Sequence, residues 1–179
     1  MKKTLRKQML EKRDSLGRQG IEEKSRAAGK LLFSLEEMKN AGIVAFYIPK
    51  GSELDTREMI ETTLKQGKKV LVPVTNEGIT MVEFESFDSL VKGKYGILEP
   101  KERKTIKEHP DIVVIPGIAF GLCMHRIGYG KGYYDSYLRF SPALRVGICY
   151  DFQVLEKLPS HEDDERMDTI VTEKRIIMM

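Results

Sequence analysis

The chain has 179 residues, of which 41% are hydrophobic and 32% charged, and this length and balance predict one globular domain over residues 1–179. Thirty lysines and arginines against 27 aspartates and glutamates give a net charge of +3, which is too small to indicate a nucleic-acid partner. No run of about 20 apolar residues is present, so the composition also excludes a membrane-spanning helix.

The first forty residues predict two helices and a short helical turn. Apolar residues recur at helical spacing over residues 2–18, with lysines and arginines on the other faces. Gly17 and Gly20 are expected to end that helix. A second helix is predicted over residues 21–33, and residues 36–40 add a short turn.

The next part of the chain predicts three strands and one helix. The unbroken apolar run at residues 43–48 is typical of a strand buried on both faces of a parallel sheet. A helix is predicted over residues 57–66 and a second strand over residues 69–74. Residues 79–84 alternate apolar and polar side chains, which indicates an edge strand, and residues 85–110 are expected to be irregular.

The last part of the chain continues the alternation of strands and helices. Strands are predicted over residues 111–115, 144–150 and 169–172, the last of the chain, with a helix over residues 131–139. This order predicts an α/β fold, with an open, mostly parallel sheet flanked by helices. Ligands bind such sheets beyond the carboxyl ends of the strands, so the loops after residues 43–48 and 111–115 are candidate sites.

The segment with the clearest chemistry is Arg126-Ile127-Gly128-Tyr129-Gly130-Lys131-Gly132-Tyr133-Tyr134-Asp135. Alternating glycines admit positive φ and leave successive N–H groups uncovered before a helix, which favours anion binding. Arg126 and Lys131 add two cations suited to phosphate oxygens. The spacing matches neither the Walker loop nor the dinucleotide fingerprint. Asp135 is either a first-turn acid favoured by the helix dipole or a Mg²⁺ ligand beside a bound phosphate.

This glycine-rich segment, preceded by Pro116–Phe120 and followed by Ser136–Leu138, closely resembles the signature of the 5-formyltetrahydrofolate cyclo-ligases, also called methenyltetrahydrofolate synthetases. Other motifs of that family follow in the same order over most of the chain. They are Lys2–Arg6, Glu53–Thr56, Tyr95–Pro100 and Asp168–Glu173. The chain departs from the family pattern at residues 121–125, at Ser136 and over residues 159–165, where it is one residue short.

The resemblance implies a reaction in which ATP and Mg²⁺ drive the conversion of 5-formyltetrahydrofolate into 5,10-methenyltetrahydrofolate, ADP and phosphate. The formyl oxygen would be phosphorylated first, so the chemistry calls for alignment and charge neutralisation rather than a nucleophilic triad. The family's fold resembles the sugar-phosphate isomerase and CoA-transferase group, in agreement with the α/β pattern.

The same resemblance implies the site residues. Those that would contact the nucleotide are Lys2, Lys3, Arg6, Arg126, Ile127, Gly128, Tyr129, Gly130, Lys131, Gly132, Tyr133 and Tyr134. Those that would contact the folate are Ile48 and Glu53 in the pterin pocket, with Tyr129, Gly130, Lys131, Gly132 and Tyr133 towards the formyl group. Lys131, Arg126 and Tyr129 would act in catalysis, and Asp135 and Asp168 would hold Mg²⁺. Without the resemblance, the basic residues at 2–6, Glu53 and Asp168 would be interpreted as ordinary surface, capping and strand-start residues.

Two other classes of function stay open from the residues alone. A sugar-phosphate isomerase-like enzyme would bind phosphate without needing ATP. A nucleotide- or RNA-binding module is suggested by the basic helix at residues 2–18, although Glu11 and Asp14 interrupt its basic surface and no aromatic platform accompanies it. We therefore expect ATP and 5-formyltetrahydrofolate as ligands, with no nucleic-acid, membrane or obligate protein partner.

The two cysteines help to predict the cellular compartment of the protein. Cys123 and Cys149 form neither a CxxC nor a zinc-binding pattern, and they are expected to be reduced thiols of a cytoplasmic protein. His125 stands close to Cys123 in the sequence, which is weak support for a catalytic thiol. No apolar stretch follows the basic residues 2–8, so no secretory signal is expected.

Overall fold

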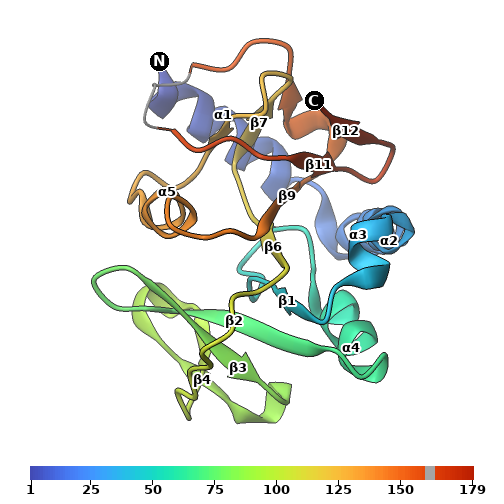
Figure 1. Cartoon of the computed structure of the whole chain (residues 1–179). Coiled ribbons are helices and arrows are strands. Elements are labelled where there is room, and N and C mark those ends of the chain that lie inside the picture. Colours follow the sequence, from blue (N-terminus) through green and yellow to red (C-terminus); the bar gives the residue numbers. More distant parts are fainter. Residues whose placement is uncertain (160–163) are drawn as a thin grey trace.

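The computed structural model describes residues 1–159 and 164–179, and its central element is a seven-stranded sheet (Figure 1). In the order in which they lie side by side, the strands are β12 (Ile176–Met178), β11 (Thr169–Val171), β9 (Leu144–Ile148), β6 (Ile112–Ile115), β1 (Ile43–Ala45), β2 (Lys69–Thr75) and β3 (Ile79–Phe84). The five inner strands are parallel, and the two edge strands, β3 and β12, are antiparallel to their neighbours. The expected mostly parallel sheet, with residues 79–84 at one edge, is confirmed. Most of the shortened segment at residues 159–165 falls outside the described residues.

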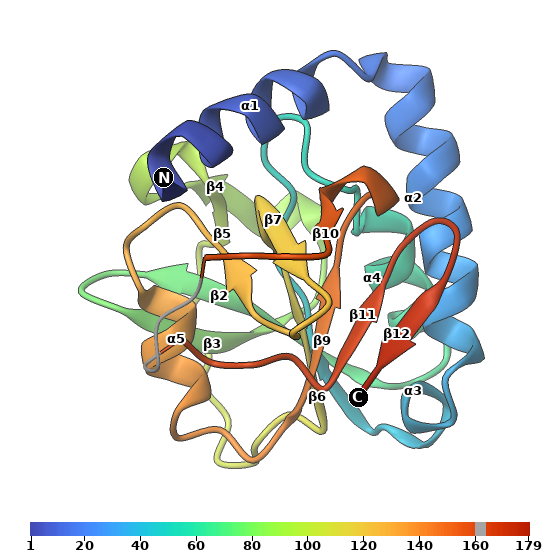
Figure 2. The same ribbon diagram turned by 90° about the horizontal axis from the view of Figure 1, so that it is seen from above.

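Helices lie on both faces of the sheet. α2 (Gly17–Ser34) and α4 (Arg57–Lys65) lie on one face and α5 (Tyr133–Leu138) on the other, while α1 (Lys2–Asp14) and α3 (Glu36–Asn40) flank this arrangement (Figure 2). No helix of the described residues is long and apolar enough to span a bilayer.

The central strands supply side chains to two separate cores. Val44 and Val114 pack in the core that includes α2 and α4. Their chain neighbours Ala45 and Val113 pack in the core that includes Leu138 of α5. Successive side chains of a strand point to opposite faces, so a strand covered on both faces is apolar at every position. This is why the unbroken apolar runs predict the buried strands.

Three expected helix boundaries need correction. The first helix ends at Asp14, and α2 begins at Gly17, whose φ of +67° suits the turn between them. Gly20 lies inside α2, because burial of residues such as Leu32 outweighs the roughly 1 kcal/mol by which an internal glycine disfavours a helix. α5 begins at Tyr133 rather than Lys131, since Gly132 has a φ of +69°.

Several short strands lie where the sequence predicts no strand. β4 (Leu90–Lys92) and β5 (Leu98–Pro100) form a hairpin, and β7 (Ala119–Gly121), β8 (Arg126–Ile127) and β10 (Val154–Leu155) form a second sheet. Each has only two or three residues, too few to establish a period in the sequence. Likewise β12 follows residues 169–172, so the strand expected to be last is not, and β1 is shorter than residues 43–48.

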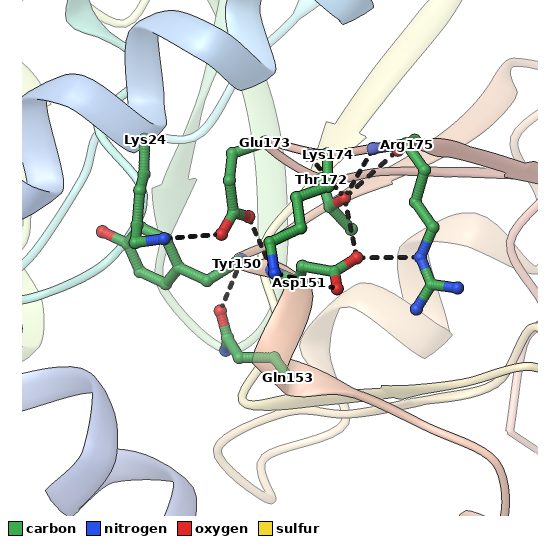
Figure 3. Close-up of polar contacts among 8 residues, drawn as sticks. All are labelled: Lys24, Tyr150, Asp151, Gln153, Thr172, Glu173, Lys174 and Arg175. Atoms are coloured by element: carbon green, nitrogen blue, oxygen red, sulfur yellow. Dashed lines mark hydrogen bonds and ion pairs between the residues drawn. The ribbon is translucent and has the colours of Figure 1, made fainter.

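A polar network fixes the C-terminal hairpin to the end of β9 (Figure 3). Asp151, just after β9, accepts hydrogen bonds from Arg175 Nε over 2.8 Å and from the Thr172 hydroxyl over 3.1 Å. Glu173 accepts from the backbone N–H of Asp151 over 2.6 Å and pairs with Lys24 of α2 over 2.8 Å. The network therefore joins α2, β9 and the turn between β11 and β12.

Candidate active site

A cavity of about 780 Å³ opens at the carboxyl edge of the sheet. Its walls include Tyr47 and Ile48 beyond β1, Thr75 at the end of β2 and Pro116 beyond β6. The glycine-rich segment, residues 126–135, forms another wall. This is the edge at which ligands bind in parallel α/β sheets, and the volume lies within the usual range of ligand pockets.

The glycines of this segment allow cations to approach the backbone. A Cβ atom at Gly128 would lie 2.7 Å from the guanidinium of Arg126, and one at Gly130 would lie 3.4 Å from the guanidinium of Arg6. Gly130 and Gly132 also have φ values of +93° and +69°, which glycine adopts without strain. The segment thus combines exposed backbone with two guanidinium groups against it.

Arg126 is buried behind the loop rather than extended into solvent. Its side chain is 5% exposed, and a terminal nitrogen lies 3.2 Å from Asp135 Oδ1. The guanidinium stacks on the Tyr134 ring at 5.4 Å. Burial lowers the pKa of the Arg126 guanidinium and the Asp135 carboxylate opposes that shift, while burial raises the pKa of Tyr134. Its Nε has no hydrogen-bond partner within the described ranges, which leaves a buried donor for a ligand.

One face of α1 supplies three further cations. Positions 2, 6 and 13 fall within about 40° of one another around a helix of 3.6 residues per turn. Lys2, Arg6 and Arg13 accordingly all line the cavity. Arg6 Nε donates to the carbonyl of Gly128 over 2.9 Å, and Lys2 pairs with Asp164 over 2.8 Å. Lys3 lies about 100° from Lys2 around the helix, is exposed and does not line the cavity.

Glu53 is the buried carboxylate of the cavity, at 8% exposure. Its Oε1 accepts a hydrogen bond from the Tyr129 hydroxyl over 3.1 Å, and its Oε2 accepts one from the backbone N–H of Lys50 over 2.9 Å. Burial raises the pKa of Glu53, and the hydrogen bonds and neighbouring cations oppose that shift. Each oxygen keeps acceptor capacity, so a ligand with two adjacent N–H donors can bind both at once.

A second wall comes from the turn between β4 and β5. The Tyr95 hydroxyl lies 3.3 Å from the Tyr133 hydroxyl, and Lys131 Nζ lies 5.6 Å from the Tyr95 ring centre. Lys50 Nζ donates to the carbonyl of Tyr95, and buried Glu99 accepts from the Thr75 N–H over 2.8 Å. These contacts hold a pair of tyrosine hydroxyls in the lining of the cavity.

The cavity brings together almost all of the site residues expected from the sequence. Those that line it are Lys2, Arg6, Ile48, Glu53, Arg126, Ile127, Gly128, Tyr129, Gly130, Lys131, Gly132, Tyr133, Tyr134 and Asp135. Arg13, Lys50 and Asp164 also line it without being expected site residues, and so does Tyr95, which the sequence marks only as part of a family motif. Arg13 could have been found from its helical spacing to Lys2 and Arg6.

The structure does not bring Asp168 to Asp135. Asp168 immediately precedes β11, and its Oδ2 accepts from the backbone N–H of Arg145 over 2.7 Å, at the amino edge of the sheet. The start of a parallel strand lies at the opposite edge from the ligand, which is why the expected pairing fails. Asp164, four residues earlier, lines the cavity instead.

The acidic residues of the described chain limit the kind of metal site. Among residues 1–159 and 164–179 no group of three or more His, Cys, Asp or Glu side chains is arranged to hold a metal ion. Asp135 and Asp164 both line the cavity, where Asp135 pairs with Arg126 and Asp164 pairs with Lys2. Two carboxylates suit Mg²⁺ that is shared with phosphate oxygens and water. A catalytic thiol is not supported, because Cys123 and His125 do not line this cavity.

Comparisons with known proteins agree with this geometry. The model of the 5-formyltetrahydrofolate cyclo-ligase family matches residues 1–173. The structure of the 5,10-methenyltetrahydrofolate synthetase of Aquifex aeolicus superposes with a TM-score of 0.89 at 36% identity, covering 99% of this chain and 92% of that one. That of Mycoplasma pneumoniae superposes with a TM-score of 0.76 at 25% identity, covering 96% and 98%. The 5-formyltetrahydrofolate cyclo-ligase of Escherichia coli K12 is 30% identical over 146 residues, which cover 76% of this chain and 80% of the relative.

Proposed function

The chain belongs to the 5-formyltetrahydrofolate cyclo-ligase family, and on that basis we propose that it cyclises 5-formyltetrahydrofolate to 5,10-methenyltetrahydrofolate in a reaction driven by ATP. The observation that carries this proposal is one cavity that combines two chemically different features. One is the glycine loop with Arg126, Lys131 and the α1 cations Lys2 and Arg6, and the other is the buried carboxylate of Glu53.

Glu53 recognises the pterin. The 2-amino group and the adjacent ring N–H of a pterin form a paired donor edge, and an ionised carboxylate is its matching acceptor. The bonds from Tyr129 and from the Lys50 backbone hold both carboxylate oxygens in place before the ligand arrives. Tyr129, expected beside the formyl group, supports this pterin contact through its hydroxyl.

The nucleotide phosphates bind the glycine loop. Its exposed backbone, with Lys2, Arg6, Arg126 and Lys131, offsets the charge of the triphosphate, because phosphoryl transfer depends mainly on positioning and charge stabilisation. Lys131 is exposed and unbranched, so it can follow the γ-phosphoryl group as that group moves.

The reaction has two steps. The formyl oxygen attacks the γ-phosphorus as the bond to the ADP oxygen breaks, which gives ADP and an iminium phosphate. N10 of the folate then attacks the formyl carbon and loses its proton, and departure of phosphate gives the methenyl product. Alignment of the formyl oxygen with the γ-phosphoryl group is the protein's main contribution.

Asp135 and Asp164 fit a Mg²⁺ ion bound together with ATP, and they replace the pair expected from the sequence. Both line the cavity, and Mg²⁺ in phosphoryl-transfer sites takes one or two carboxylates. When bound, the ion neutralises charge on the phosphate oxygens. The ion pairs with Arg126 and Lys2 orient the two carboxylates.

Other features belong to the same proposal. A single domain is supported by the family match over residues 1–173, and a cytoplasmic location by two free thiols, Cys123 and Cys149. We expect no obligate protein partner. The kinship of the fold with the sugar-phosphate isomerase and CoA-transferase group is supported by the parallel order β11-β9-β6-β1-β2.

An oxygen-labelling experiment tests the proposed intermediate. 5-Formyltetrahydrofolate carrying ¹⁸O in its formyl group is converted with Mg-ATP, and the released phosphate is analysed by mass spectrometry. We expect one ¹⁸O atom in each phosphate and one ADP for each methenyl product. Unlabelled phosphate, or turnover that needs no ATP, would contradict phosphorylation of the formyl oxygen.

A further inference from the structure

Arg13 is a buried cation without an assigned role, at the far end of the cavity-lining face of α1. It is 4% exposed, yet it lines the cavity. Its Nε donates to the Ser52 hydroxyl oxygen over 3.0 Å, and a terminal nitrogen donates to the Tyr129 hydroxyl over 2.9 Å. Ser52 in turn donates to the carboxylate of Asp14. A guanidinium is suited to this place, because its planar fork presents two donors at a fixed spacing.

The contacts of Arg13 converge on Glu53 from two directions. Tyr129 accepts from Arg13 and donates to Glu53 Oε1, so one hydroxyl connects the guanidinium to the carboxylate. Ser52 is the chain neighbour of Glu53, so the second contact fixes the backbone that carries the carboxylate. Tyr150 also donates to the carbonyl of Ser52 over 3.1 Å.

We propose that Arg13 is the positioning residue for pterin recognition, acting through Tyr129 and Ser52 to hold the Glu53 carboxylate ionised and correctly oriented. The inference rests on the proposed function, in which Glu53 accepts the paired donors of the pterin. It extends that function to a residue that lies two hydrogen bonds away from the folate contact, through the Tyr129 hydroxyl.

The electrostatic surroundings of Glu53 show why a cation is needed. Desolvation raises the pKa of Glu53, whereas Arg13 and Lys50 lower it together with the hydrogen bonds from Tyr129 and from the Lys50 backbone. Tyr47 and Tyr134 also lie near it: burial raises the pKa of both phenols, and the Glu53 charge raises it further. Removal of Arg13 takes away one of the charges that lower the pKa of Glu53, so this pKa rises further.

The test compares steady-state kinetics of Arg13→Met, Tyr129→Phe and Glu53→Gln with the wild type, for folate and ATP separately and over a range of pH. We expect Arg13→Met and Tyr129→Phe to raise the KM for 5-formyltetrahydrofolate about tenfold, with the KM for ATP changed less than about twofold. The acid-side rise of the folate KM should begin at higher pH in Arg13→Met. Arg13→Lys keeps the positive charge, so the pH at which the folate KM begins to rise should be closer to that of the wild type than in Arg13→Met.

The double variant Arg13→Met/Glu53→Gln separates positioning from general packing. If Arg13 acts through Glu53, the double variant should resemble Glu53→Gln alone, because the target of the positioning is already lost. The inference would be overturned if the losses of folate affinity in the two single variants add up in the double variant. It would also be overturned if the folate KM of Arg13→Met begins to rise at the same pH as that of the wild type. Tyr129→Phe removes one hydroxyl from a half-exposed ring, so it keeps the test decisive if Arg13→Met does not fold.

Two controls make the outcomes distinct. Arg18→Met removes the same charge from an exposed position of α2, where Arg18 pairs only with Glu22 among the described residues, and should leave both KM values unchanged. If Glu53→Gln leaves the folate KM unchanged, the proposed pterin contact is wrong. If Glu53→Gln raises that KM but Arg13→Met does not, the pterin contact stands and the role of Arg13 is wrong.

Discussion

Lys2 Nζ lies 2.8 Å from Asp164 Oδ2, so the first turn of α1 is joined to the segment that precedes β11. Both side chains line the cavity and are only 23% exposed. An ion pair at this depth keeps the Asp164 carboxylate in the cavity that Asp135 also lines. The relationship distinguishes Asp164 from Asp168, which bonds the Arg145 backbone at the other edge of the sheet.

The first prediction compares these two aspartates. We expect Asp164→Asn to raise the KM for Mg-ATP about tenfold or more, since an amide contributes no full charge to Mg²⁺. Asp168→Asn keeps an oxygen that can accept from the Arg145 N–H, and its kinetics should stay within about twofold of the wild type. Initial rates against Mg-ATP at saturating folate measure the difference. A larger effect at Asp168 than at Asp164 would refute this assignment.

The second prediction concerns Lys131. We expect Lys131→Ala to lower kcat about a hundredfold, which corresponds to roughly 3 kcal/mol of lost stabilisation of the migrating phosphoryl group. The side chain is exposed on the glycine loop, so thermal unfolding should not change. Lys107→Ala, at another exposed lysine, serves as the control. A folded Lys131→Ala enzyme with normal turnover would remove Lys131 from the mechanism.

The third prediction uses the raised pKa of Glu53 and concerns stability rather than binding. Because burial raises the folded-state pKa, this group stabilises the fold at pH values below its unfolded pKa, and that contribution is lost as the pH rises through the folded pKa. We therefore expect Glu53→Gln to be more stable than the wild type at neutral pH, with the difference shrinking on acidification. Denaturant unfolding of the ligand-free proteins at several pH values measures it. A variant less stable at neutral pH would show that the carboxylate is fully compensated.

The sequence predicts the main sheet well, because strands buried on both faces leave unbroken apolar runs such as Ile43–Ile48 and Ile112–Ile115. It does not predict β7, β8 and β10, since strands of two or three residues carry no period and depend on tertiary contacts such as that of Gln153 with the carbonyl of Ile118.

The sequence predicts the site residues that belong to a local motif. It does not predict the residues that only the fold brings into the cavity. The glycines around Lys131 indicate an anion-binding loop from the sequence alone. Asp164 carries no such mark, and only the path of the chain before β11 places it in the cavity. Arg13 is intermediate, because its spacing to Arg6 puts both on one helix face but does not show what covers that face.

The fourth prediction concerns the network in Figure 3. Glu173 is 7% exposed in its side chain and bonds both Lys24 and the Asp151 N–H. We expect Glu173→Ala to reduce the free energy of unfolding by about 2 kcal/mol, because it leaves two half-buried partners, Lys24 and the Asp151 N–H, unpaired. Glu36→Ala breaks an exposed pair with Lys39 and should change it by less than about 0.5 kcal/mol. Equal losses in the two variants would show that the network contributes no more than a surface ion pair.

The most direct test of the central claim is to mix the purified protein with 5-formyltetrahydrofolate and Mg-ATP and to follow the methenyl chromophore by absorbance. We predict that the chromophore appears only when protein, folate, ATP and Mg²⁺ are all present, with one ADP formed for each methenyl product. No chromophore from folded protein with all components present, or equal rates without ATP, would contradict the assignment of this cavity to ATP-driven cyclisation of the folate.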